Sequence, residues 1–156
     1  MKQGLGTQLR HLIELLDGAV EQSYLDAGLA YRPRYTPVMR TLLAHEPLTI
    51  GEIAVRAGIT QPAATQTVAL MIKEGLLVAS AGKLDGRRKM VTLSDAGRAM
   101  LPRLKACWKA TAAAAASLDA QLPYPLSEAL SDAIDALKEE SFGERIRKAG
   151  AAQAPK

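Results

Sequence analysis

The side chains best suited to chemistry in this sequence are four cations gathered within seven residues. They are Lys83, Arg87, Arg88 and Lys89, and they share the segment with one acid, Asp85. Asp85-Gly86 is a strong turn dipeptide, so the cations would stand at the tip of a β-hairpin. Such a tip suits phosphate binding, and arginine is attracted by the negative potential of a narrow minor groove. A solvated loop is the alternative interpretation.

One face of a helix predicted over residues 61–74 offers a second binding surface. Thr60 can cap this helix, and Pro62 fits its first turn. Small, amide and hydroxyl side chains suit entry into a major groove, where they can hydrogen-bond to base edges. That face holds Gln61, Pro62, Thr65, Gln66, Ala69 and Lys73, and the face predicted to be buried holds Ala64, Val68, Met71 and Ile72. An ordinary polar face on a short helix is the alternative.

The elements around these residues form a helix, a tight turn, a second helix and a hairpin. Thr49 and Glu52 make a capping box at the start of the first helix, and Gly58 ends it. Residues 77–81 and 90–93 are the strand-like runs of the hairpin. Because Val91 and Leu93 are two positions apart, they share one face of their strand. This layout predicts a winged helix-turn-helix.

The segment from Thr36 through Leu101 resembles the MarR (multiple antibiotic resistance) family of bacterial winged helix-turn-helix regulators. Its most specific part, DGRRKMVTLSDAG from Asp85 to Gly97, is similar to the family's D-x-R wing followed by V-x-L-[ST]-x-x-G. Residues 48–54 resemble the family's entry into the helix-turn-helix, and residues 74–77 resemble its exit into the wing. The combination is specific, whereas each piece alone is weak.

The resemblance implies a transcriptional regulator that binds a pseudo-palindromic DNA operator as a homodimer and represses by blocking polymerase access. Arg87 would enter the minor groove from the wing tip, and Asp85 would brace it or a neighbouring cation. Many relatives carry a cation at the position of Gln66, so an amide replaces a phosphate or base contact here. The full set of expected DNA-contacting residues is Thr60, Gln61, Pro62, Thr65, Gln66, Lys73, Lys83, Asp85, Arg87, Arg88 and Lys89.

We expect a mainly α-helical chain with a small β-hairpin, in four parts. These are an N-terminal dimerisation helix at residues 1–30, a DNA-binding lobe at 31–93 (recognition helix 61–74, wing 77–93), C-terminal dimerisation helices at 94–147 and a flexible tail at 148–156.

Apolar stripes run along the terminal helices, and they require a partner surface. The first helix carries Leu9, Leu12, Ile13, Leu16 and Val20; the long helix that Ser94 can cap carries Leu101, Leu104, Trp108, Ala112 and Ala115; and a final helix after Pro123 and Pro125 carries Leu126, Leu130, Ile134 and Leu137. One winged unit of this size cannot cover three such stripes. The resemblance implies that these helices interleave with those of a second copy, and packing within one chain is the alternative.

Positive charge is concentrated in the winged segment. Residues 30–110 hold thirteen basic and five acidic side chains, a formal charge of +8, whereas residues 1–29 and 111–156 each carry −2. Phosphate binding is expected to leave this footprint. No apolar run is long enough to span a bilayer, and Glu14 and Asp17 make the start of the chain unlike a secretion signal. With a single cysteine, an internal disulfide is excluded, and we expect a cytoplasmic protein without a membrane partner.

The sequence offers no pattern for catalysis or metal binding. His11 and His45 lie far apart, and no H-E-x-x-H, C-x-x-C or nucleophile-elbow motif occurs. We therefore expect neither an enzyme nor a metal or cofactor site. Two alternatives to an effector-controlled regulator stay open. One is a winged-helix module that binds protein, and the other is a redox-responsive regulator acting through Cys107, although buried cysteines are commonly inert.

The resemblance also implies a small aromatic or lipophilic anionic effector, bound between the dimer helices and the winged lobe. Rings and cations cluster near that junction: Tyr24, Tyr31, Arg32, Arg34, Tyr35 and Arg40. Such an effector would shift the population away from the conformation that fits DNA. The alternative is that Arg32 and Arg34 contact phosphate while the tyrosines pack against the dimer helices.

Overall fold

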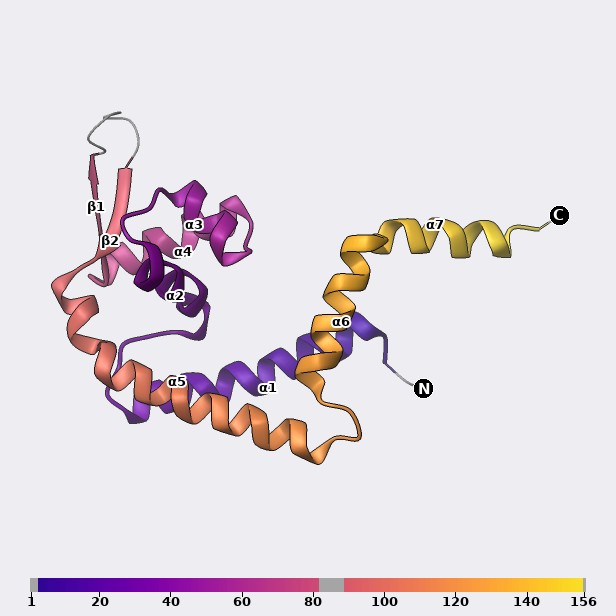
Figure 1. Ribbon diagram of the computed structural model, residues 1–156, viewed down its shortest axis with the longest axis horizontal. Coiled ribbons are helices and arrows are strands. Elements are labelled where there is room, and N and C mark those ends of the chain that lie inside the picture. Colours follow the sequence, from indigo (N-terminus) through magenta and orange to yellow (C-terminus); the bar gives the residue numbers. More distant parts are fainter. Residues whose placement is uncertain (1–2, 82–88, 156) are drawn as a thin grey trace. The chain divides into compact units, whose positions relative to one another are not determined.

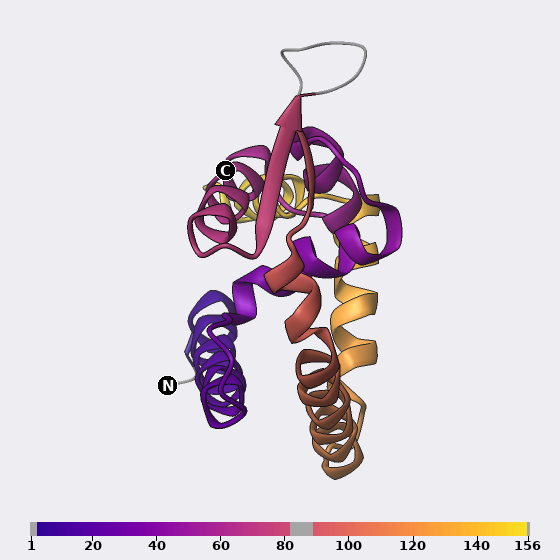
Figure 2. The ribbon, with the colours of Figure 1, turned by 90° about the vertical axis from the view of Figure 1, so that its left-hand side faces the viewer.

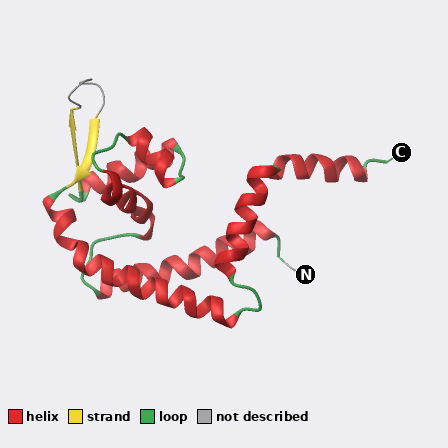
Figure 3. Cartoon of the chain, viewed as in Figure 1, coloured by secondary structure: helices red, strands yellow, loops and turns green. Residues whose placement is uncertain are grey.

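The computed structural model describes residues 3–81 and 89–155 (Figure 1). Helices dominate these residues, and their two strands form one antiparallel hairpin (Figure 3). The expected fold class, a mainly helical chain with a winged helix-turn-helix lobe, is confirmed. The chain divides into two compact units, Met1–Lys109 and Ala110–Lys156.

The first unit contains the helix-turn-helix and the hairpin. Its elements are α1 (Leu5–Asp26), the 3-10 turn η1 (Pro33–Tyr35), α2 (Thr36–His45), α3 (Ile50–Ala57), α4 (Gln61–Lys73), β1 (Leu77–Ala81), β2 (Lys89–Leu93) and the first part of α5 (Asp95–Gln121). Both ribbon views show α2, α3 and α4 gathered beside the hairpin (Figures 1 and 2). The helix expected at residues 61–74 is therefore α4, one residue shorter than predicted.

Local hydrogen bonds fix the turn between α3 and α4. The Thr49 hydroxyl accepts from Glu52 N at 3.2 Å, and the Glu52 carboxylate accepts from Thr49 N at 2.8 Å, so the predicted capping box is present. Gly58 ends α3 in the left-handed region with φ 68°, where a side chain would be strained. The Thr60 hydroxyl then caps α4 by accepting from Ala63 N at 3.3 Å.

The core of this unit lies between the helices and one face of the hairpin. Its fully buried side chains include Val38, Met39 and Leu42 of α2, Ile53 of α3, Val68 and Met71 of α4, and Leu77 and Val91 of the hairpin. Val91 and Leu93 share the buried face, as their spacing predicts. The prediction for Ile72 was wrong, because this side chain is 37% exposed, one helical step beyond the buried Met71.

A third segment closes the free edge of strand β2. Leu48 N donates to Val91 O at 3.2 Å, and Val91 N donates to Leu48 O at 2.7 Å. The Glu46 carboxylate accepts from Leu93 N at 2.9 Å and pairs with Arg98 at 2.5 Å. The hairpin base is thus held both by the segment before α3 and by the start of α5.

Gly97 lies against the turn that leads from α4 into β1. Ser94 N donates to Leu76 O at 3.0 Å, and the Ser94 hydroxyl donates to Gly75 O at 2.5 Å while accepting from Gly97 N at 3.0 Å. A Cβ atom built on Gly97 would clash with the Leu76 carbonyl oxygen. The neighbouring atom is backbone, so a side chain at this position requires the chain to shift.

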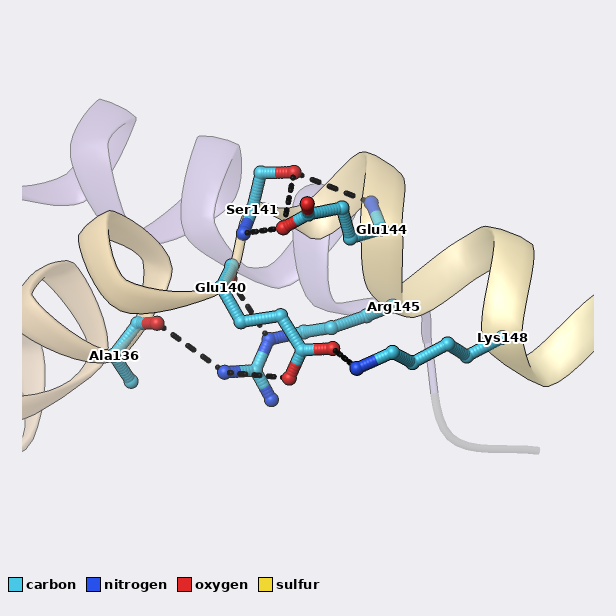
Figure 4. Close-up of polar contacts among 6 residues, drawn as sticks. All are labelled: Ala136, Glu140, Ser141, Glu144, Arg145 and Lys148. Atoms are coloured by element: carbon cyan, nitrogen blue, oxygen red, sulfur yellow. Dashed lines mark hydrogen bonds and ion pairs between the residues drawn. The ribbon is translucent and has the colours of Figure 1, made fainter.

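The second unit contains the end of α5, α6 (Leu126–Glu139) and α7 (Phe142–Gln153). Its helix junction is closely bonded (Figure 4): Ser141 and Glu144 form a capping box, and the Glu140 carboxylate pairs with Arg145 at 3.9 Å and Lys148 at 2.5 Å. The flexible tail predicted at 148–156 was wrong over 148–153, which belong to α7. A capping box in Ser141-Phe142-Gly143-Glu144 was the sequence signal for this helix.

The terminal helices bury few of their apolar side chains within one chain. α6 and α7 contain no buried residue, and Tyr24 is the buried residue of α1. Along α6, Leu130, Ile134 and Leu137 are 39%, 56% and 44% exposed. On α1, Ile13 is 54% exposed and Leu16 is 46% exposed. These stripes follow the predicted pattern, and the single chain leaves them open.

Replacing Gly97 with alanine is expected to destabilise the first unit by roughly 1 to 3 kcal/mol, the usual cost of overpacking a tight site. Urea unfolding followed by circular dichroism would measure this change. Gly51→Ala is the matched control, because a Cβ there meets its nearest neighbour at an ordinary 3.7 Å and alanine favours helix. Equal stability of the two variants would contradict the close approach at Gly97.

Candidate nucleic-acid interface

The outer face of α4 is the most distinctive surface of the first unit. Gln61, Pro62, Thr65, Gln66 and Ala69 are all exposed on it, whereas Ala64, Thr67, Val68 and Met71 are buried. Lys73, also exposed, is the single cation of this helix. The face therefore presents amide, hydroxyl and small apolar groups at i, i+3, i+4 and i+7 spacing, as the sequence predicted for a helix that enters a groove.

Hydrogen bonds limit what two of these side chains can offer. The Thr65 hydroxyl donates to Gln61 O at 3.0 Å, so towards a ligand it presents an acceptor and a methyl group. The Thr60 hydroxyl accepts from Ala63 N and serves as the helix cap. Thr60 thus has a structural role, and Thr65 keeps only part of its hydrogen-bonding capacity.

Three side chains in and next to the turn η1 contact α4 and its C-cap residue Glu74. The Tyr35 hydroxyl donates to the Glu74 carboxylate at 2.7 Å, and Arg32 approaches the other Glu74 oxygen at 3.6 Å. Arg34 Nη2 donates to Thr67 Oγ1 at 3.2 Å and to Gln66 Oε1 at 3.5 Å. Sequence reasoning left two roles open for Arg32 and Arg34, an effector site or phosphate contacts. In the structure Arg34 contacts α4, and Arg32 contacts Glu74 at its end.

Burial keeps the Tyr35 hydroxyl protonated in this network. Desolvation and the hydrogen bond to Glu74 raise the pKa of Tyr35 to about 12. An ionised phenolate beside the Glu74 carboxylate would be repelled, so the neutral phenol serves as a donor over the whole physiological pH range.

The wing tip lies outside the described residues. Lys83, Asp85, Arg87 and Arg88 belong to it, so their predicted DNA contacts stay predictions. Lys89 opens β2 opposite Ala81 and is exposed.

A cluster of aromatic rings lies in the first unit, within the region proposed for an effector. Tyr24, Tyr31 and Tyr35 are buried, and their rings meet edge to face with centroids 4.9 Å and 5.5 Å apart. Trp108 is 6.5 Å from Tyr31, and the Arg40 guanidinium lies 4.4 Å from the centroid of the Trp108 ring. Of the six residues predicted to hold an effector, Tyr24, Tyr31, Tyr35 and Arg40 are brought together, and Trp108 joins them.

One polar atom of this cluster lacks a partner. Trp108 Nε1 is buried, and no atom of the described residues accepts its hydrogen bond. An unpaired buried N–H costs about 1 to 3 kcal/mol, so an acceptor at this position would be stabilising. Sequence reasoning placed Trp108 only in the apolar stripe of the long helix. Its contact with Arg40 joins α5 to α2, and a contact between distant segments is not visible in the sequence.

Metal and membrane sites do not appear within residues 3–81 and 89–155. No group of three or more histidine, cysteine or acidic side chains in these ranges is arranged to hold a metal ion. None of the helices in the same ranges combines the length and apolar character needed to cross a bilayer.

The fold and the outer face of α4 define the class: this is a winged helix-turn-helix protein. Residues 31–88 match the sequence profile of the MarR family, which confirms the resemblance in the segment that holds the helix-turn-helix. Among curated protein sequences, none matches the chain.

Solved structures of transcriptional regulators share the fold. The transcriptional regulator MosR from M. tuberculosis, in complex with DNA, is 20% identical, with 97% of this chain and 100% of that chain covered and a TM-score of 0.68. The repressor CouR, bound to a 23-mer DNA duplex, is 22% identical, with coverages of 86% and 92% and a TM-score of 0.66. The regulator PcaV from Streptomyces coelicolor, in complex with its natural ligand, is 22% identical, with coverages of 90% and 99% and a TM-score of 0.62. Identities this low establish the fold alone.

Proposed function

We propose that this protein is a MarR-type transcriptional regulator that binds double-stranded DNA through α4 and the wing. The observation that carries the proposal is the outer face of α4, which is exposed, nearly uncharged and rigidly held by the capped turn and by η1. Solvated surface helices usually collect Glu and Lys, whereas groove-reading helices present amides, hydroxyls and small groups. The cations predicted at the wing tip would supply phosphate contacts beside it.

A homodimer that binds a pseudo-palindromic operator is the assembly we infer. The exposed apolar stripes of α1 and α6 support it, because a second copy of this chain offers the same stripes for mutual burial. Two recognition helices related by a two-fold axis would enter successive major grooves about one DNA turn apart. We also propose that the protein acts in the cytoplasm and represses transcription by blocking polymerase access.

We further propose that a small aromatic anion releases the regulator from DNA. Support comes from the Trp108 N–H, which lacks a partner among the described residues, and from the Arg40 guanidinium stacked on the same ring. A carboxylate or phenolate could accept from the first and pair with the second. Two regulators that share the fold support a small-molecule effector: PcaV was solved in complex with its natural ligand, and the DNA binding of BpsR is regulated by 6-hydroxynicotinic acid.

Arg87→Ala is expected to weaken operator binding by roughly 1 to 3 kcal/mol, because the wing would lose its minor-groove contact. Fluorescence anisotropy against DNA from upstream of the protein's own gene, with a random duplex for comparison and several salt concentrations, would measure it. Lys138→Ala removes the same charge from α6 and should leave affinity unchanged. If Arg87→Ala binds as tightly as the wild type at matched salt, the wing assignment is wrong.

Ile134→Glu is expected to weaken the dimer by at least tenfold, since a carboxylate buried in an apolar interface without a partner costs several kcal/mol. Sedimentation velocity over a range of protein concentrations would follow the dimer, and operator binding should fall in parallel. Ala136→Glu places the same charge away from the stripe of α6 and serves as the control. A wild-type protein that sediments as a monomer would contradict the proposed assembly.

Benzoate and its hydroxylated derivatives are expected to change the fluorescence of Trp108, the single tryptophan of the chain, and to lower operator affinity. Benzamide, which is neutral, should do neither. Arg40→Gln should weaken the response to benzoate by about tenfold while preserving operator binding, because one charge-assisted contact is lost. Quenching that is unchanged in Arg40→Gln would show that the anion binds elsewhere.

A further inference from the structure

The contact between Arg34 and Gln66 joins two residues that lie far apart in the sequence. Arg34 belongs to η1, before the helix-turn-helix, and Gln66 lies on the outer face of α4. Arg34 is exposed and pairs with no carboxylate of the described residues, and its Nη2 reaches both Gln66 Oε1 and the buried hydroxyl oxygen of Thr67. A guanidinium without an acidic partner is thus held against the face proposed to read DNA.

Arg34 is held in place by its neighbours on both sides. Pro33 restricts the backbone of η1, and Tyr35 is fully buried and bonded to Glu74. The backbone from which Arg34 extends is therefore anchored to the end of α4. The 3.2 Å hydrogen bond from Arg34 to the buried Thr67 hydroxyl then places the guanidinium beside Gln66.

The chemistry of the guanidinium decides which way the Gln66 amide points. Arginine has five N–H donors and no acceptor, so only the oxygen end of an amide can face it. Gln66 Oε1 accordingly turns towards Arg34, and no described residue accepts from Gln66 Nε2. The end of Gln66 that is left for a ligand is the NH₂ group, which only donates.

We propose that Arg34 is a specificity-determining residue that acts through Gln66, by orienting its amide so that it reads a hydrogen-bond acceptor on a base edge. This inference rests on the proposed DNA-binding function. A free glutamine pairs well with adenine, because it donates to N7 and accepts from N6. With its oxygen held by Arg34, Gln66 instead suits guanine, whose major-groove edge presents the two acceptors N7 and O6.

Four proteins test this role: wild type, Arg34→Ala, Gln66→Ala and the double variant. Selection from a randomised duplex library first identifies the base pair whose preference disappears in Gln66→Ala. Anisotropy titrations then compare guanine and adenine at that position, at several salt concentrations. Arg32→Ala is the matched control. It removes an exposed arginine from the same segment, but Arg32 contacts Glu74 and not Gln66. Thermal unfolding checks that each variant folds.

The expected result is a wild-type preference for guanine at that position that Arg34→Ala reduces roughly tenfold, with preferences elsewhere retained. Arg32→Ala keeps the guanine preference, and adding Arg34→Ala to Gln66→Ala changes no base preference further. A positioning role predicts this dependence, whereas a direct base contact by Arg34 would persist without Gln66.

Two results would overturn the inference while leaving the proposed function intact. In one, Arg34→Ala weakens binding to all duplexes equally and lowers the salt slope by about 0.9, as loss of a phosphate contact would. In the other, wild type selects a sequence but Gln66→Ala changes no base preference. A wild-type protein that selects no sequence at any salt concentration would overturn the proposed function together with the inference.

Discussion

The close approach of the α4–β1 turn to the start of α5 is the contact on which the winged lobe depends. At this point Ser94 bonds to the carbonyls of Gly75 and Leu76, and Gly97 leaves room for the Leu76 oxygen. Leu77 follows Leu76 and Leu93 precedes Ser94, and these two residues form the pair at the base of the hairpin. One backbone contact therefore sets the exit of the recognition helix, the register of the wing and the beginning of the long helix. A shift there would move all three together, because a one-residue change of register exchanges the buried and exposed faces of a strand.

A second constraint joins the recognition helix to the aromatic cluster. Within residues 31–40, Tyr31 contacts Trp108 and Tyr24, Tyr35 bonds to Glu74 at the end of α4, and Arg40 lies over Trp108. The Tyr31 hydroxyl is also 3.3 Å from Thr36 Oγ1, at the first residue of α2. A ligand that accepts a hydrogen bond from Trp108 would thus contact a chain of packed side chains that extends to the end of α4. Packed side chains transmit such a displacement only if they have two stable arrangements.

Local signals in the sequence were enough to predict the helix-turn-helix and the hairpin. Capping boxes, glycines at helix ends and the alternation of Val91 and Leu93 act over a few residues, so their outcome is visible in the sequence itself. Contacts between distant segments were not visible. Nothing in Pro47-Leu48-Thr49 signals that Leu48 pairs with Val91, and nothing in Tyr31-Arg32-Pro33-Arg34-Tyr35 shows that the two arginines turn towards α4 while the tyrosines enter the core. The helical residues 148–153 are a different case, because their signal was local but a composition rich in alanine and glycine suggested a tail.

The outer face of α4 carries little charge, so contacts to bases and contacts to phosphates would come from different surfaces of the protein. Phosphate contacts give affinity that falls steeply with salt, whereas hydrogen bonds to bases give selectivity that depends little on salt. The exposed face of α4 carries Lys73 as its single cation. This helix therefore adds little to phosphate binding, but it can contribute hydrogen bonds to bases. The positive charge of residues 30–110 must then act from the segments around the helix, and Arg34 is one cation that the structure places there. Because its guanidinium faces the oxygen of Gln66, this charge can influence the pattern of donors on α4 without lying on the helix itself. Selectivity at that point is therefore a property of two chain segments, and the sequence of α4 alone would suggest the wrong donor–acceptor pattern.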